Sequence, residues 1–218
     1  MRKLLSGREG PKQADSVVVF VHGYGADGAD LLGLADPLGP HLPGTAFYAP
    51  DGPEPSLVNP AGRQWFPIPR MDGSSPAEAQ AGLLRAADDL NGFLDAVLAA
   101  EGLGNDRLAL VGFSQGTMLS LFVAPRRAPP VAGVVGFSGR VLAPERLAAD
   151  TVSRPPILLA HGDADPVVPF SDLRAGAEAL AGAGFDVATH VMRGTGHGIS
   201  PDGLSVALRF LLDAFAPR

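Results

Sequence analysis

The chain has 218 residues, of which 46% are hydrophobic and 18% charged, so it can bury the core of one ordinary domain. A formal net charge of −6 with no dense basic block argues against a nucleic-acid partner, because phosphate binding needs clustered Lys and Arg. The chain contains no cysteine, which excludes disulfides, thiolate metal sites and a cysteine nucleophile.

The N-terminal stretch "MRKLLSGREG" begins like a signal peptide, but polar residues follow before an apolar segment can form. No apolar run approaches the roughly 18 residues that a membrane helix needs. We therefore expect a soluble, cytoplasmic protein with no integral membrane association. The scarcity of lysine and the abundance of Ala, Gly and Pro fit a GC-rich bacterial genome.

Strand-like and helix-like segments alternate along the chain. In chain order, the patterns predict strands at 16–22 and 45–50, a helix at 83–100, a strand at 107–113 with a helix after it, strands at 131–139 and 155–163, a helix at 172–184, a strand at 185–192 and a helix at 202–215. Apolar strands that alternate with helices indicate an α/β fold with a mostly parallel sheet, covered by helices on both faces. We expect a single domain over residues 1–218, with residues 1–15 as an N-terminal extension.

A long segment, residues 50–82, interrupts this alternation. It is rich in Pro and Gly up to residue 76 and contains the only tryptophan. Loops of this length inside a compact domain are usually functional or disordered, and an aromatic pair favours order. We expect an ordered loop over the site, whose apolar side chains bind substrate together with Val168; these loop residues are Leu57, Trp65, Phe66 and Ile68.

Polar residues follow four of the predicted strands, where ligand sites form in parallel sheets. Ser114 lies in "GFSQG", at a corner between a strand and a helix. "HGYG" follows the first strand, "HGDADPVVP" offers Asp163 and Asp165, and "RGTGHGIS" offers His197. The chain order Ser, Asp, His is the order used by α/β-hydrolases, and it is more specific than the serine motif alone.

The residue types match the chemistry of acyl transfer. A neutral serine hydroxyl is a weak nucleophile and needs a neighbouring base. Histidine suits this role because it exchanges protons near neutrality, and a carboxylate behind the ring fixes its tautomer. The glycines of "GFSQG" allow a sharp turn and close packing of the helix on the strand.

The motifs "HGYGADG", "RQWF", "GFSQG", "HGDADPVVP" and "GTGHGIS" together resemble the phospholipase/carboxylesterase family of α/β-hydrolases, which includes bacterial carboxylesterases and acyl-protein thioesterases. The resemblance covers about residues 16–215. It implies the α/β-hydrolase fold without a large cap domain. It also implies a nucleophile at Ser114, an orienting acid at Asp165, a base at His197, and an oxyanion hole made by the backbone N–H groups of Tyr24 and Gln115.

Other residues compete for these roles. Asp163 is a second candidate acid, although the family pattern places the acid at Asp165, just before "PVVP". Ser138 in "GFSGR" imitates the nucleophile motif, but no helical pattern follows it directly. Thr117 stands where many relatives have a second glycine, which leaves the fit of the helix start open.

The remaining histidines have simpler interpretations. His22 and His161 precede tight turns, and we expect them to hold loops by hydrogen bonds. His41 and His190 have no supporting motif and are interpreted as surface or packing residues. No pair of histidines has metal-ligand spacing, so we expect no metal and no cofactor.

The sequence therefore predicts a serine carboxylesterase that hydrolyses small to medium acyl esters through an acyl-enzyme. The alternatives are an acyl-protein thioesterase or lysophospholipase of the same family and, from another class, a non-catalytic binding protein on a hydrolase scaffold. A dienelactone-type hydrolase is excluded because it needs a cysteine. The expected partner is a small-molecule ester or thioester, and a homodimer is left open.

Overall fold

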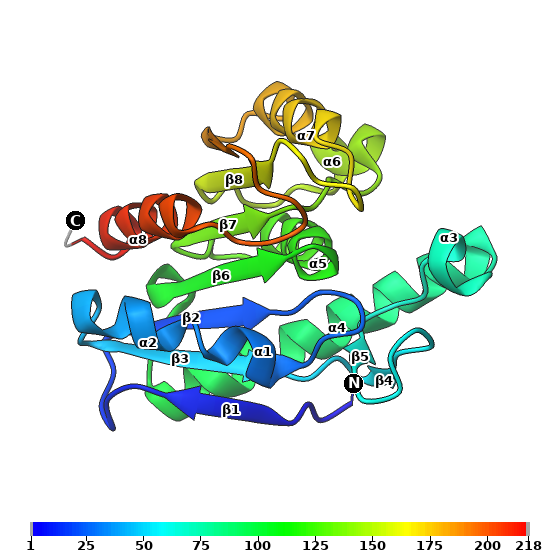
Figure 1. Ribbon diagram of the computed structural model, residues 1–218. Helices are drawn as coiled ribbons and strands as arrows, with labels where there is room; N and C mark the ends of the chain where they lie inside the picture. The colour runs from blue at the N-terminus through cyan, green and yellow to red at the C-terminus, as the bar shows by residue number, and fades with distance from the viewer. Residues whose placement is uncertain (1, 217–218) are drawn as a thin grey trace.

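The computed structural model describes residues 2–216, which surround one large sheet (Figure 1). In order across the sheet, the seven strands are β1 (Ser6–Glu9), β3 (Thr45–Pro50), β2 (Ser16–Val21), β6 (Leu108–Phe113), β7 (Gly133–Phe137), β8 (Ile157–Gly162) and β9 (Val187–Met192). The last six run parallel to one another, and β1 is antiparallel to β3. The mostly parallel sheet of the α/β-hydrolase fold, predicted from the sequence, is thus confirmed.

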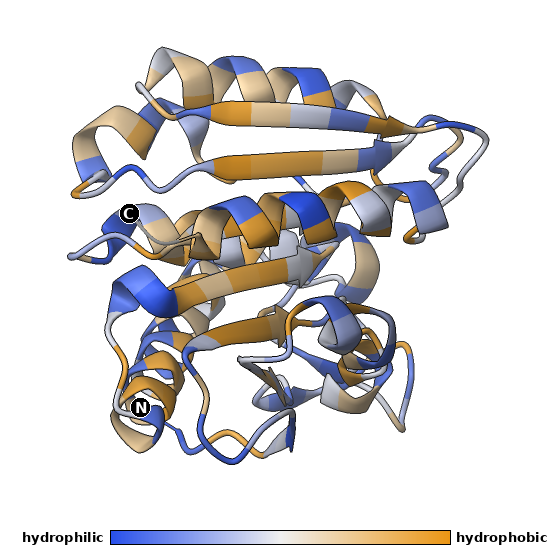
Figure 2. Cartoon of the chain, turned by 90° about the vertical axis from the view of Figure 1, so that its left-hand side faces the viewer, coloured by the Kyte–Doolittle hydropathy of each residue, from blue (hydrophilic) through white to orange (hydrophobic). Residues whose placement is uncertain are grey.

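Helices cover both faces of the sheet. One face carries α4 (Pro76–Glu101), α5 (Gln115–Val123) and α7 (Ser171–Gly182), and the other carries α1 (Gly28–Leu32), α2 (Ala35–Leu38) and α8 (Pro201–Phe215). The interior strand β2 is buried throughout, with Val17 and Val19 toward the first face and Val18 and Phe20 toward the second. Figure 2 shows the resulting pattern, in which the strands are mostly hydrophobic and the helices alternate between polar and apolar residues.

The helix predicted at 83–100 begins earlier, at Pro76, so the predicted loop end at residue 82 is wrong. The hydroxyl of Ser75 accepts a hydrogen bond from the N–H of Glu78, and the Glu78 carboxylate accepts one from the N–H of Ser75. This reciprocal capping box starts the helix, and Pro76 fits its first position. Gly102, in the left-handed conformation at φ 70°, ends it.

The N-terminal extension contains a strand that the apolar pattern did not indicate. Residues of β1 pair with β3 in the register Ser6 to Pro50 and Glu9 to Phe47. Every residue of β1 is exposed, so it has no apolar signature. A short, charged edge strand of this kind discourages pairing with other chains.

Residues 51–75, which we call the strap, connect β3 to α4. They form a two-stranded hairpin of β4 (Glu54–Pro55) and β5 (Arg63–Gln64), followed by the one-turn helix α3 (Pro69–Asp72). The remaining short helices are α6 (Leu147–Asp150) and the 3₁₀ turns Gly39–His41, Asn105–Arg107, Ala124–Arg126 and Pro144–Arg146. Within the described part of the chain, no helix has both the length and the hydropathy needed to cross a membrane.

Candidate active site

The corner after β6 holds Ser114 in a strained conformation. Its backbone has φ 53° and ψ −113°, a region that a side chain with a Cβ rarely occupies. A Cβ on Gly116 would overlap the carbonyl oxygen of Val21, and one on Gly112 would lie 2.5 Å from the backbone nitrogen of Thr117. The glycines are therefore required by the close approach of α5 to the sheet, while the unusual dihedral angle falls on the serine itself.

Thr117 fits the helix start because glycines face it, one on β7 and one just after that strand. A Cβ on Gly136 would lie 2.5 Å from the methyl group of Thr117, and a Cβ on Gly139 would overlap its Cβ. The Thr117 hydroxyl lies within hydrogen-bond distance of two carbonyl oxygens, those of Gly112 (2.8 Å) and Phe137 (2.7 Å). The departure from the family pattern thus adds a link between α5, β6 and β7.

The structure brings Ser114, His197 and Asp165 into one hydrogen-bonded chain. His197 Nε2 lies 3.0 Å from the Ser114 hydroxyl, and His197 Nδ1 lies 2.8 Å from Asp165 Oδ2. Because an ionised carboxylate only accepts hydrogen bonds, Nδ1 carries the proton and Nε2 is free to accept one from the serine. The ring of Phe113 packs against His197 with centroids 4.9 Å apart, a contact that no sequence motif indicates.

The side chain of Asp165 has no exposed surface and accepts hydrogen bonds from several donors. Its Oδ1 accepts hydrogen bonds from the N–H groups of Val167 (2.8 Å) and Val168 (2.9 Å). Burial alone would raise the pKa of Asp165, but the hydrogen bonds from His197 and from these two N–H groups outweigh it and hold the pKa below its ordinary value. The carboxylate that contacts His197 is that of Asp165; Asp163 instead accepts a hydrogen bond at Oδ1 from the N–H of Gly194 (2.7 Å).

Two backbone N–H groups are expected to form an oxyanion hole, and the loop that carries one of them approaches the nucleophile, since a Cβ on Gly23 would lie 3.4 Å from the Cβ of Ser114. Gln115 is the first residue of α5, where an N–H has no partner within the helix and the helix dipole favours negative charge. Tyr24 follows β2 in the loop at residues 22–25. Neither N–H donates to any residue that the structure describes, so both remain available to a ligand.

His22 fixes the shape of that loop. Its Nε2 accepts a hydrogen bond from the N–H of Gly52 (2.8 Å), so its proton lies on Nδ1, which donates to the carbonyl oxygen of Gly23 (2.7 Å). Burial lowers the pKa of His22, which keeps the ring neutral. The expectation that His22 holds a loop therefore agrees with its contacts.

The strap is tied to the nucleophile corner by the side chain of Gln115. The Gln115 amide accepts from the N–H of Trp65 (2.9 Å) and donates to the carbonyl oxygen of Phe66 (2.7 Å). The indole N–H of Trp65 donates to the carbonyl oxygen of His22 at 3.0 Å. On the far side of the strap, the guanidinium of Arg70 donates to the carbonyl oxygen of Val167 at 2.9 Å.

The predicted substrate wall needs correction. Trp65 has no exposed surface and packs against the ring of His22, so it supports the strap and offers no face to a ligand. Phe66 and Val168 are also buried, at 5% and 3% exposure. Leu57 is 72% exposed in the connection between β4 and β5. Of the predicted wall residues, Ile68 alone is half-buried.

The other candidates fall outside the hydrogen-bonded chain. The Ser138 hydroxyl is buried with no partner among the described residues, so no base is placed to activate it. His41 is exposed, and His190 pairs with Asp202 at 2.8 Å on the surface. Within residues 2–216, no group of three or more His, Asp or Glu side chains is arranged to hold a metal ion.

The chain is similar to known proteins both in sequence and in structure. Residues 8–214 match the phospholipase/carboxylesterase family. The chain is 31% identical to the esterase YpfH of Escherichia coli over 204 residues, which cover 92% of this chain and 83% of the relative. It is 28% identical to acyl-protein thioesterase 1 of Gibberella zeae, with 98% and 99% covered. The crystal structure of esterase PE8 superposes with a TM-score of 0.92 at 38% identity, covering 98% of this chain and all of that one.

The resemblance noted in the sequence motifs is thus confirmed over nearly the whole chain; the relatives are named as an esterase and a thioesterase, and esterase PE8 shares the fold. The chain belongs to the phospholipase/carboxylesterase family of α/β-hydrolases and is a carboxylic ester hydrolase.

Proposed function

We propose that this hydrolase is a serine carboxylesterase that cleaves small to medium acyl esters through an acyl-enzyme, with Ser114 as nucleophile, His197 as base and Asp165 as orienting acid. The observation that carries the proposal is the continuous hydrogen-bonded chain through these three residues, held on a strained corner. The proposal includes the cytoplasmic location expected from the sequence.

In the first step, the Ser114 oxygen attacks the ester carbonyl carbon while His197 Nε2 takes the hydroxyl proton. Asp165 stabilises the resulting imidazolium, and the N–H groups of Tyr24 and Gln115 donate hydrogen bonds to the negatively charged oxygen of the former carbonyl group. The imidazolium then gives its proton to the leaving alcohol, which leaves the acyl group on Ser114. His197 then takes a proton from water, which attacks the acyl carbon; the bond to the Ser114 oxygen breaks, the carboxylic acid leaves, and the imidazolium returns the proton to the serine.

The preference for small to medium acyl groups rests on the strap. Lipases that act on oil surfaces open a mobile apolar cap, whereas the strap is tied down by Gln115 at one side and by the Arg70 to Val167 contact at the other. Its several prolines further restrict backbone motion. Each acyl methylene that the site buries adds about 0.8 kcal/mol of binding, and the gain ends when the site is full.

The test combines a nucleophile variant with a substrate panel. Ser114→Ala should abolish turnover while the far-UV circular dichroism spectrum stays unchanged, and a fluorophosphonate probe should label the wild type at Ser114 only. Retention of a tenth of the activity by Ser114→Ala would contradict the mechanism. For wild type, kcat/KM on aryl esters of graded acyl length should rise and then stop rising.

A thioesterase is the second candidate, because a relative that aligns over nearly the full length of both chains is named acyl-protein thioesterase 1. The same triad would serve, since only the leaving group differs. An acyl thioester and a lysophospholipid are therefore measured beside the ester panel. If kcat/KM for the acyl thioester or for the lysophospholipid exceeds the value for every aryl ester, the enzyme is a thioesterase or a lysophospholipase, respectively, and the carboxylesterase proposal is wrong.

A further inference from the structure

The carboxylate of Asp165 also contacts a second histidine, His161, and both residues contact Val168. Oδ1 of Asp165 accepts from the N–H of Val168, and the carbonyl oxygen of the same Val168 lies 3.0 Å from Nε2 of His161. That Nε2 also lies 3.3 Å from Oδ2 of Asp165, the oxygen that contacts His197. Val168 and His161 therefore contact both oxygens of the carboxylate, Val168 at Oδ1 and His161 at Oδ2.

Both neighbours of His161 Nε2 are oxygens that accept hydrogen bonds, so this nitrogen carries the proton. The shorter contact, to Val168, is the hydrogen bond proper, and the contact to Asp165 is an electrostatic one at a longer distance. His161 stands at the end of β8, before the turn that contains Asp165. It thus joins a rigid strand to the far side of that turn.

Such support matters because the terminal torsion of an aspartate is soft. Rotation about the bond to the carboxylate has a broad, roughly two-fold profile, so the plane of the group must be held by its neighbours. If the plane of Asp165 turns, the oxygen that orients His197 moves out of line. A displacement of about 1 Å in a catalytic array can cost a hundredfold in rate.

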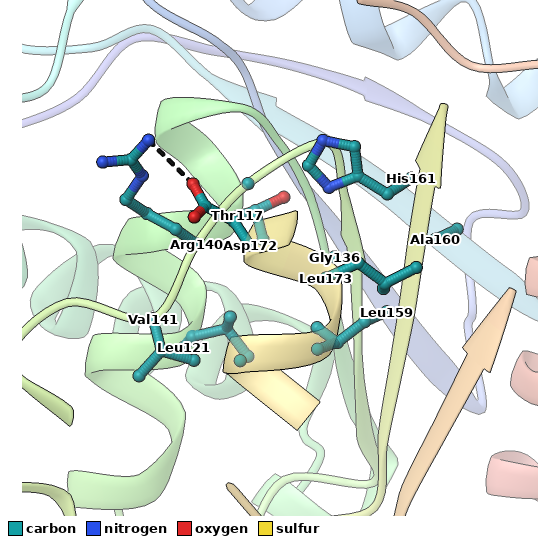
Figure 3. Close-up of a pocket in the computed structure, with 12 residues that line it drawn as sticks. Thr117, Leu121, Gly136, Arg140, Val141, Leu159, Ala160, His161, Asp172 and Leu173 are labelled. Carbon is teal, nitrogen blue, oxygen red and sulfur yellow. Dashed lines mark ion pairs between the residues drawn. The ribbon is translucent and has the colours of Figure 1, made fainter. Parts of the chain in front are cut away.

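The surroundings of His161 are tight and contain few charges. The side chain is 2% exposed, and the ring meets Phe170 edge-on with centroids 6.1 Å apart. Figure 3 shows its other surroundings, a cavity of about 10 Å³ lined also by Arg140 and Asp172, which form an ion pair at 2.7 Å. A cavity of that size holds one water at most, so it is no substrate site.

We propose that His161 is a positioning residue, which holds the carboxylate plane of Asp165 so that Asp165 can orient His197. This inference rests on the proposed function, because it assigns His161 a role through the orienting acid. His161 touches neither Ser114 nor His197 among the contacts of the structure, so its effect passes through Asp165 and the turn that carries it.

The test replaces His161 by two amide side chains of different length, glutamine and asparagine. His161→Gln places an amide nitrogen at about the position of the histidine Nε2, whereas the amide of His161→Asn falls about one bond short of Val168. We expect His161→Asn to lower kcat about tenfold to a hundredfold with little change in KM, and His161→Gln to stay within about threefold of wild type. His190→Asn, at the surface pair with Asp202, is the matched control and should keep full activity.

The second part of the test repeats the series in an Asp165→Ala background, read with a fluorogenic ester. If His161 acts through Asp165, the loss caused by His161→Asn should disappear there, since a pair that acts together shows a coupling energy in a double-mutant cycle. Thermal unfolding checks that each variant is folded. If His161→Asn does not fold, His161→Met, which fills the space without a donor, replaces it.

The outcomes separate this inference from the proposed function. An active Ser114→Ala enzyme overturns the proposed function itself. An inactive Ser114→Ala enzyme together with wild-type activity in His161→Asn overturns the positioning role alone. Equal losses from His161→Asn in the wild-type and Asp165→Ala backgrounds also overturn it, because the residue then acts on the fold and not through the acid.

Discussion

Replacing Gln115 by methionine should loosen the strap and lower the stability of the protein. The Gln115 side chain is completely buried, and its amide forms one hydrogen bond with the N–H of Trp65 and one with the carbonyl oxygen of Phe66. Methionine has a similar length and volume, so the change removes both hydrogen bonds while leaving little empty space. Two buried backbone groups are then left without partners.

The expected magnitude follows from these two groups. Leaving one buried donor or acceptor unsatisfied costs about 1–3 kcal/mol, so the pair should cost about 2–6 kcal/mol. The total stability of a domain is only about 5–15 kcal/mol. At a shift of about 2–4 °C per kcal/mol for a chain of this size, the midpoint of thermal unfolding should fall by roughly 5–20 °C.

Urea unfolding followed by circular dichroism measures the loss of stability, and amide hydrogen exchange locates it. The N–H of Trp65 should exchange much faster in Gln115→Met than in wild type. Gln80→Met, on the exposed surface of α4, is the matched control and should change the free energy of unfolding by less than about 0.5 kcal/mol. Gln115→Glu should cost more stability than Gln115→Met at neutral pH, because it would bury a carboxylate without a counter-charge against the carbonyl oxygen of Phe66.

The reasoning is refuted if Gln115→Met unfolds within about 0.5 kcal/mol of wild type and the Trp65 amide remains protected, given that an unsatisfied pair should cost at least about 2 kcal/mol. A loss of stability without faster exchange at Trp65 would also contradict it. In that case the glutamine would act through the packing of α5, and the strap would be held by its other contacts.

Asp165→Asn should lower kcat about ten-thousandfold, because an amide favours the wrong histidine tautomer, whereas Asp163→Asn should cost far less; equal losses would reverse the choice of acid. The lowered pKa of Asp165 keeps its carboxylate ionised near neutrality. The rate should therefore be low in acid and reach a plateau at higher pH, because a protonated His197 cannot take the serine proton; a flat profile of folded enzyme from about pH 5 to 8 would argue against a histidine base. The stability contributed by ionised Asp165 is present above the ordinary aspartate pKa and is lost as the pH falls through its lowered value, so wild type and Asp165→Asn should converge in urea stability only in strong acid. Gly116→Ala should be insoluble or strongly destabilised, because its methyl group would overlap a backbone carbonyl that cannot move aside; a soluble variant with an unchanged melting temperature would contradict this. Trp65→Ala should cost about 3–5 kcal/mol of stability and change kcat/KM by the same factor for short and long acyl esters; a loss confined to long esters would restore its role as a substrate wall.

The sequence predicts the parallel strands well because a strand buried on both faces must be a continuous apolar run. The same rule explains the missed strand β1, since its side chains are all exposed and only its backbone pairing with β3 marks it as a strand. Apolar periodicity predicts too late a start for α4 because it begins inside the helix, whereas the capping box of Ser75 and Glu78 marks the N-terminus of the helix.

At the site, the sequence indicates positions at strand ends, which parallel topology brings together. The role of Trp65 could not be predicted in this way, because an aromatic side chain in a loop can line a groove or fill a core. Its partners decide the matter, and they lie 43 and 50 residues away, at His22 and Gln115. The contact of His161 with Asp165 likewise depends on the path of the turn between them, which residue spacing leaves undefined.

The burial of Trp65 also gives the enzyme an optical reporter. It is the only tryptophan in the chain, so all indole fluorescence comes from one ring. That ring lies 5.3 Å from the ring of His22, and its N–H is bonded to the His22 carbonyl, in the loop that ends with the expected oxyanion donor. A protonated imidazole quenches indole emission more strongly than a neutral one, and burial keeps His22 neutral. Emission should therefore stay bright and blue-shifted while the strap is seated, and a drop or a red shift would report the release of the strap in real time, without a label.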